Sequence, residues 1–190
     1  MIGPVTGTRA VIAAATLLLG LSACSGEDPD PQVAPPSPTE PSTTGTSAET
    51  PPEMPEAAKG TDAAAAEAFV KFYWETVNYA QQSGDLAGLR EISSDKCIAC
   101  QAGIDYLEDV FAKNGEFTGG VGRVSNPTAA FATNAGITYA VVDFDLALTR
   151  QRVDFPGTDE DEAYTGGSNR VRARLEPTSS GWIMDYWDEL

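Results

Sequence analysis

The chain of 190 residues contains no histidine. Histidine is the commonest general base and the commonest metal ligand in proteins. Its absence excludes a Ser-His-Asp triad, a Cys-His pair and a His-ligated zinc site within this chain. Basic residues are also scarce, because 12 Lys and Arg stand against 28 Asp and Glu, which gives a formal net charge of −16. A chain this acidic repels a phosphate backbone, so nucleic acid is not expected as a partner.

A hydrophobic run long enough to span a bilayer is also missing from the sequence. The apolar run Ala10 to Leu21 follows the single charge of Arg9. It is shorter than the roughly 20 residues that a membrane-spanning helix needs. A basic start, a short apolar stretch and small residues at its end are typical of a secretory signal peptide, which we predict over residues 1–23.

Cysteine is rare, and the first of the three cysteines directly follows this segment. The residues Leu21-Ser22-Ala23-Cys24 resemble the lipobox of bacterial lipoproteins. In that family the signal peptide is cut before the cysteine, which is then lipidated. The resemblance implies acyl chains such as palmitate on Cys24, and a lipid anchor on the extracytoplasmic face of the cell membrane. The alternative is an ordinary signal peptide followed by a chance cysteine.

Residues 24–60 differ in composition from the rest of the chain. Nine of the 13 prolines occur between residues 25 and 60, among serines, threonines and acidic residues. Such a segment has almost nothing to bury, so we predict a disordered tether that favours extended polyproline II conformations. The tether would hold a folded domain away from the membrane.

Residues 61–190 have the composition of one domain, and its first half is predicted to be helical. Asp62 can cap a first helix, and Ser83-Gly84-Asp85 ends it. A short helix over 86–92 and a third helix that ends at Asn114-Gly115 follow. The apolar stripes of the first and third helices consist of Phe69, Phe72, Tyr73, Thr76, Val77 and Ala80, and of Cys100, Ile104, Leu107 and Phe111.

The second half of the domain is predicted to form strands over residues 117–124, 128–133, 137–150, 169–175 and 181–187. Alternation places Trp182, Met184 and Tyr186 on one face of the last strand. Helices followed by an antiparallel meander predict an α+β fold, with the N-terminal helices packed on a curved antiparallel sheet. The acidic segment 159–162 lacks the ligand spacing of a calcium loop, so we predict a solvated loop tip there. The surrounding residues 154–167 are predicted to form a long acidic loop or a splayed hairpin tip.

The stretch "FVKFYWETVNYAQQSGDLAGLREISSDKCIACQAGID", residues 69–105, resembles an uncharacterised family of actinobacterial lipoproteins. Members of that family combine a lipobox and a Pro/Thr-rich tether with a domain that bears Cys-x-x-Cys. The resemblance implies a surface location and assigns no activity. The order of helices and strands also resembles the NTF2-like, cystatin-like cone fold, which by itself implies no function.

Cys97 and Cys100 form a Cys-x-x-Cys pair that allows three interpretations. A zinc site needs four ligands, and the chain has no second pair and no histidine. A redox site gains support from a helix N-terminus, which lowers the pKa of a thiol, but the helix–helix context differs from that of thioredoxin-like proteins. In an oxidising compartment a structural disulfide between Cys97 and Cys100 is the favoured interpretation.

Carboxylates and arginines alternate on two of the predicted strands. Asp143 and Asp145 lie opposite the apolar face of their strand, and Arg170, Arg172 and Arg174 do the same on theirs. A cross-strand ladder of charges on the outer sheet face is the favoured interpretation. The alternative is acid–base catalysis of the kind that a Tyr/Asp isomerase of the cone fold performs.

Aromatic side chains are the remaining candidates for a site. We predict that Tyr73, Tyr79, Trp182 and Tyr186 line a pocket at the mouth of the cone, while the alternative is that they form core. Without a catalytic constellation, the sequence indicates a protein that is not an enzyme and needs no metal and no cofactor. The favoured function is a binding or scaffolding module at the cell envelope with an envelope protein as partner. The alternative is a carrier of a small apolar ligand.

Overall fold

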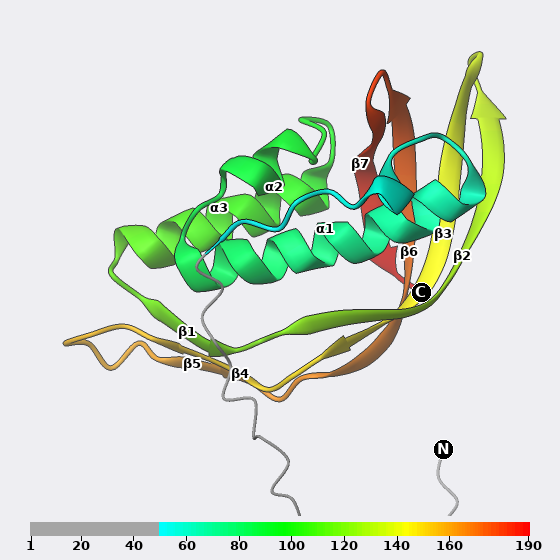
Figure 1. The fold of residues 1–190 in the computed structure, drawn as a ribbon. Coiled ribbons are helices and arrows are strands. Elements are labelled where there is room, and N and C mark those ends of the chain that lie inside the picture. Colours follow the sequence, from blue (N-terminus) through cyan, green and yellow to red (C-terminus); the bar gives the residue numbers. More distant parts are fainter. Residues whose placement is uncertain (1–49) are drawn as a thin grey trace, which may run out of the picture. The chain divides into compact units, whose positions relative to one another are not determined.

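The computed structural model describes residues 50–190, so the signal peptide, Cys24 and most of the tether lie outside the described residues. The described elements are η1 (Glu56–Ala58), α1 (Ala63–Ser83), α2 (Ala87–Glu91), α3 (Ile98–Ala112), β1 (Glu116–Gly119), β2 (Gly122–Asn134), β3 (Ile137–Leu148), β4 (Gln151–Asp154), β5 (Glu162–Tyr164), β6 (Gly167–Thr178) and β7 (Gly181–Glu189). Across this part of the chain, no helix has the length and apolar character needed to cross a bilayer. The α+β class predicted from the sequence is confirmed (Figure 1).

The first helix begins and ends where the sequence predicts. The Asp62 side chain accepts a hydrogen bond from the Ala65 backbone N–H at 2.8 Å, which satisfies one of the free amides of the first turn. Gly84 ends α1 in the left-handed conformation, with φ of 75°. Such a conformation costs a residue with a Cβ atom more than it costs glycine.

The strands form two antiparallel sheets rather than one continuous meander. The larger sheet has the strand order β2-β3-β6-β7, and the smaller has the order β1-β4-β5. The segment predicted as an acidic loop or hairpin tip connects β4 to β5, which pair with each other. Figure 1 shows that α1 runs along the concave side of the long, curved strands.

Helix α1 is tied to the edge strand β2 by polar contacts. Asn78 donates to the Gly122 carbonyl and accepts from the Gly122 N–H, both at 2.8 Å. Farther along the strand, Glu67 accepts from the Ala129 N–H at 3.1 Å. These contacts cover backbone groups that an edge strand otherwise leaves open to pairing with another chain.

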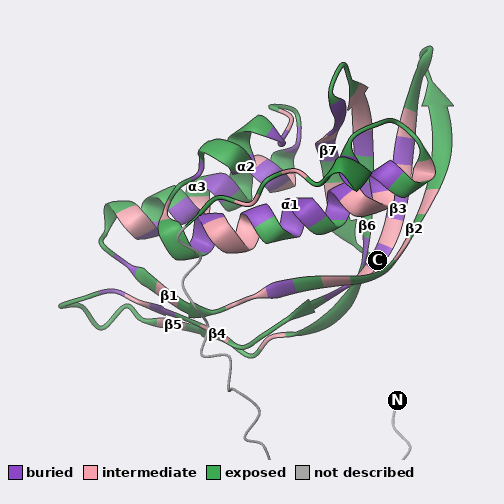
Figure 2. Ribbon diagram, in the orientation of Figure 1, coloured by how far each residue is buried: buried purple, intermediate pink, exposed green. Residues whose placement is uncertain are grey.

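The core lies between the helices and one face of the larger sheet, as the purple segments of Figure 2 show. Val142 and Phe144 of β3 are fully buried, whereas Asp143 and Asp145 point to the other face, as the alternation predicts. On β6, Val171, Ala173 and Leu175 are buried and the intervening arginines are exposed. Burial of each large apolar side chain stabilises the fold by about 1.5–3 kcal/mol.

The predicted orientation of Tyr186 is wrong because β7 contains a β-bulge. Arg174 pairs with Tyr186 while Leu175 pairs with Met184, so Asp185 is the extra residue. One inserted residue reverses the alternation beyond it. Tyr186 is therefore 43% exposed on the outer face, and Trp187 packs against the core instead.

The predicted boundary between tether and domain at residue 60 is also corrected. Ala58 is fully buried, and Met54 packs against the core. The Ala58 carbonyl lies close to Gly181, at the start of β7. The folded domain therefore includes residues that the proline content alone assigns to the tether.

Candidate ligand-binding site

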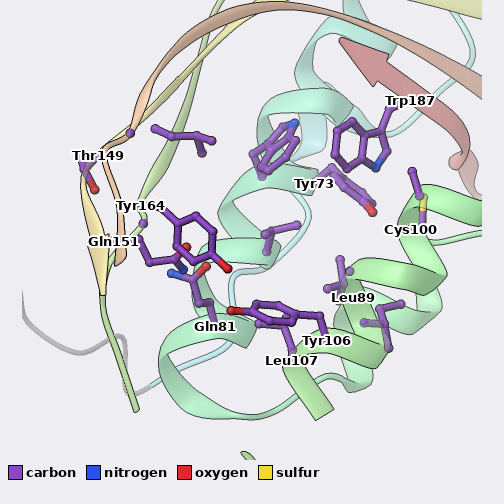
Figure 3. A pocket seen from close by; sticks show the side chains of 18 residues that line it. Tyr73, Gln81, Leu89, Cys100, Tyr106, Leu107, Thr149, Gln151, Tyr164 and Trp187 are labelled. Carbon is purple, nitrogen blue, oxygen red and sulfur yellow. The ribbon is translucent and has the colours of Figure 1, made fainter. Parts of the chain in front are cut away.

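A cavity of about 270 Å³ lies between the helices and the ends of several strands (Figure 3). Its walls are mainly apolar and aromatic, which is the usual character of small-molecule sites. Helices α1, α2 and α3 contribute one side, and residues around β3, β4, β5 and β7 contribute the other. The lining residues are Tyr73, Trp74, Val77, Gln81, Leu89, Ala99, Cys100, Gly103, Ile104, Tyr106, Leu107, Gly120, Leu148, Thr149, Gln151, Tyr164, Gly166 and Trp187.

Three aromatic rings meet at the inner end of this cavity. Trp74 meets Tyr73 and Trp187 edge to face, with ring centroids 6.1 and 5.6 Å apart. The Tyr73 hydroxyl lies 3.3 Å from the hydroxyl of Ser93. Burial raises the pKa of Tyr73 to about 12, and the hydrogen bond to Ser93 offsets only part of this effect. Tyr73 is therefore neutral at physiological pH and supplies an apolar wall.

Trp74 also carries an unsatisfied polar group. Its side chain is buried, and its indole Nε1 has no hydrogen-bond partner within residues 50–190. A buried donor without a partner costs about 1–3 kcal/mol. The nitrogen itself has almost no accessible surface, so the ring of Trp74, and not its N–H, forms part of the cavity wall.

Two tyrosines at the outer end share one carboxylate. Tyr106 of α3 and Tyr164 of β5 both donate to Oε2 of Glu162, at 2.8 and 2.6 Å. The hydrogen bond from Tyr164 lowers the pKa of Glu162 most, and the hydrogen bond from Tyr106 lowers it further. Burial, followed by the interactions with Tyr164 and Glu162, raises the pKa of Tyr106. All three groups therefore hold their ordinary charge states at neutral pH, with the carboxylate ionised.

Two amide side chains supply the polar part of the wall. Gln81 donates from Nε2 to the Gly119 carbonyl at 2.9 Å, and Gln151 lies beside it (Figure 3). Gly120 sits under both amides in the left-handed region, with φ of 70°. A Cβ atom there would lie 2.6 Å from Nε2 of Gln151 and 2.7 Å from Nε2 of Gln81. The left-handed conformation favours glycine at this position, whereas the ends of the two glutamine side chains can move away from a Cβ atom.

The structure separates the four residues that the sequence predicts as pocket lining. Tyr73 lines the cavity described above. Tyr79 lines a different hollow beside α2, and Trp182 lines another near the β2–β3 turn. Tyr186 lies on the outer sheet face, where the Arg174 guanidinium lies 5.8 Å from its ring.

Most of the aromatic lining was not selected from the sequence. Trp74 and Trp187 carry no signal that distinguishes a lining residue from a core residue. A usable signal exists on α3, where Ala99 and Gly103 are spaced one turn apart beside Tyr106. Small residues at such spacing leave a gap on one helix face.

Cys97 and Cys100 form a disulfide in the structure, with their Cα atoms 5.2 Å apart. Cys97 is the N-cap of α3, and its sulfur accepts from the Cys100 N–H at 3.2 Å. Both cysteines are buried, and Cys100 also contributes to the cavity wall. The disulfide thus fixes the start of the helix that carries one side of the cavity.

The charge ladder lies on the outer face of the larger sheet, opposite the buried face. Arg172 makes two hydrogen bonds of 2.7 Å with Asp143, and Arg170 makes one of 3.0 Å with Asp145. Arg174 departs from the expected ladder and binds Asp185. Neither Asp143 nor Asp145 lines the cavity. Among residues 50–190, no group of three or more acidic or cysteine side chains is arranged to hold a metal ion.

A model of the DUF6318 family, a family of unknown function, matches residues 39–186. The chain belongs to the DUF6318 family. This DUF6318 chain is similar in structure to the intermembrane space region of the chloroplast protein ARC6, with 14% identity and a TM-score of 0.52. The similarity covers 69% of this chain and 98% of that one, and at this identity it concerns the fold alone. None of the curated proteins matches the DUF6318 chain.

Proposed function

We propose that this DUF6318 protein is a non-catalytic binding module that takes a small, mainly apolar ligand into the cavity between its helices and strands. The observation that carries the proposal is the aromatic and aliphatic wall of that cavity. Its volume of about 270 Å³ lies just below the range of roughly 300–1,000 Å³ typical of drug-sized ligands. The ligand is therefore smaller than a typical drug molecule.

The polar groups of the wall support binding rather than catalysis. Tyr73 is neutral, and the hydroxyl protons of Tyr106 and Tyr164 are already donated to Glu162. Gln81 and Gln151 are amides, which neither take up nor release protons at neutral pH. Such groups orient a ligand and fix its polar end.

We place the module on the extracytoplasmic face of the cell membrane. The support is the lipobox-like Leu21-Ser22-Ala23-Cys24 and the proline-rich segment that follows it. Lipidated Cys24 would anchor the protein, and the segment would carry the domain into the cell envelope. The long helix on the concave side of a curved sheet supports an NTF2-like relationship, in which the cavity occupies the mouth of a cone.

The experiment that tests the proposal blocks the cavity from α3. A Cβ atom on Gly103 meets no other atom within 4 Å, so Gly103→Phe adds a ring at the cavity wall without a backbone clash. Ala102→Phe adds the same ring one residue away, at an exposed position that does not line the cavity. The neutral fluorophore N-phenyl-1-naphthylamine reports binding by its rise in fluorescence.

The wild-type protein and Ala102→Phe are expected to bind the fluorophore equally, and Gly103→Phe at least tenfold more weakly. Equal binding by all three proteins would show that the fluorophore sits elsewhere. Absence of binding to the wild-type protein, at concentrations up to its solubility, would count against an apolar site.

A further inference from the structure

The cavity combines many aromatic rings with a wall that has no formal charge. Five rings line it, from Tyr73, Trp74, Tyr106, Tyr164 and Trp187. Among the described lining residues there is no Lys, Arg, Asp or Glu. From this combination, and building on the proposed function, we propose that the ligand is a small organic cation with an alkylated ammonium group.

The outer end of the cavity favours positive charge. Both tyrosine hydroxyls donate their protons to Glu162, so their oxygen lone pairs remain as acceptors. The ionised Glu162 contacts both hydroxyls from the start of β5, and Asp159 and Glu160 precede it on the acidic connection between β4 and β5. The nearby Lys113 is held by Asp109 at 2.7 Å, which offsets its charge. A narrow site beside this carboxylate attracts cations and repels anions.

The uncharged wall selects the type of cation. A primary ammonium is strongly hydrated and, once buried, needs a carboxylate or several acceptors around it. An alkylated ammonium carries its charge on an apolar surface, which aromatic faces stabilise through their negative quadrupole. Rings of Tyr and Trp without a carboxylate in the wall suit this second type.

The test compares two esters of the same shape by isothermal titration calorimetry. Acetylcholine carries the cationic nitrogen and an ester, and 3,3-dimethylbutyl acetate replaces the nitrogen by neutral carbon. We expect acetylcholine to bind the wild-type protein about tenfold more tightly than the neutral ester. Choline, which lacks the acetyl group and therefore buries less apolar surface, is expected to bind more weakly than acetylcholine.

The variant Glu162→Gln tests whether the charge of Glu162 causes the preference for acetylcholine over the neutral ester. Glutamine still accepts from both tyrosines, so the wall is kept while the charge is lost. Acetylcholine is expected to lose about threefold to tenfold in affinity, and the neutral ester to change by less than twofold. Gly103→Phe should weaken both esters.

Equal binding of the two esters, or tighter binding of the neutral one, would overturn the cationic ligand and leave the apolar site intact. The same holds if neither ester binds while N-phenyl-1-naphthylamine does. If none of the three compounds binds, the proposed function fails together with this inference. Loss of affinity for both esters in Glu162→Gln would show that Glu162 affects binding by positioning Tyr106 and Tyr164, and not by its charge. That result would also contradict the proposed cation.

Discussion

Arg174 donates from Nε to Oδ2 of Asp185 at 2.7 Å, and its Nη2 lies 2.6 Å from the same oxygen in an ion pair. The Asp185 side chain is only 4% exposed, and Asp185 is the extra residue of the β-bulge in β7. The guanidinium also lies 5.3 and 5.8 Å from the ring centroids of Tyr139 and Tyr186. One arginine therefore neutralises a buried carboxylate and joins two aromatic rings on the outer face.

Replacement of this arginine should destabilise the domain. Arg174→Met keeps the apolar stem but leaves the buried Asp185 without its donor, which costs about 1–3 kcal/mol in the free energy of unfolding. Arg170→Met is the matched control, because its partner Asp145 is 35% exposed and also accepts from Asn126. Urea denaturation measures both. A larger loss in Arg170→Met than in Arg174→Met would contradict the account.

The bulge in β7 could not be predicted from the sequence. Alternation predicted the buried faces of β3 and β6 correctly, since these strands keep an unbroken period of two. It failed on β7, where one extra residue exchanges the positions of Tyr186 and Trp187. No residue in "GWIMDYWDEL" marks the bulge, and the contact of Asp185 with Arg174 on another strand follows from no local pattern.

The cavity itself could be predicted only in part. Tyr73 was found because it lies on the apolar stripe of α1. Tyr106 and Tyr164 come from elements far apart in the sequence and meet through Glu162, a contact that no local pattern encodes. Similarly, the prolines of residues 50–60 predict an unfolded tether, but Ala58 is buried. Its burial depends on contacts with β7, which the local sequence does not indicate.

Removal of the disulfide should lower stability and keep the fold. Cys97→Ser with Cys100→Ser removes a very short cross-link at the N-terminus of α3. The chain-entropy estimate for so short a loop is about 2 kcal/mol. We expect a lower Tm in thermal unfolding and an unchanged far-ultraviolet circular dichroism spectrum. An unchanged Tm would mean that the disulfide adds nothing to stability, and a lost spectrum would mean that it is needed for folding.

The outer charge ladder should make stability depend on pH. The hydrogen bonds from Arg172, more than any other interaction, hold the pKa of Asp143 below its ordinary value. Its stabilising contribution is therefore complete above about pH 4, the unfolded pKa of an aspartate, and is lost as the pH falls through the lower, folded pKa.

The variant Asp143→Asn isolates that contribution. Between about pH 4 and pH 2 the Tm of the wild-type protein should fall more steeply than that of Asp143→Asn. Thermal unfolding followed at several pH values measures both slopes. Parallel curves for the two proteins would show that the Asp143–Arg172 pair contributes no pH-dependent stability.

The proposed anchor predicts a change of cell fraction. Lipidation needs the thiol of Cys24, so Cys24→Ala should release the protein from the membrane fraction into the soluble fraction. Immunoblots of the separated fractions measure this. Cys97→Ser with Cys100→Ser serves as the control and should remain with the membrane. Retention of Cys24→Ala in the membrane fraction would contradict lipid anchoring at this residue.

The most direct test of the binding site uses the indole N–H signals of the three tryptophans in ¹⁵N NMR spectra. Trp74 and Trp182 both have a buried nitrogen without a partner among residues 50–190, but only Trp74 lines the cavity. On titration with acetylcholine, the Trp74 signal should shift as the ligand contacts its ring, while that of Trp182 stays in place. A shift at Trp182 without one at Trp74, or no shift at either up to millimolar ligand, would contradict a ligand site in this cavity.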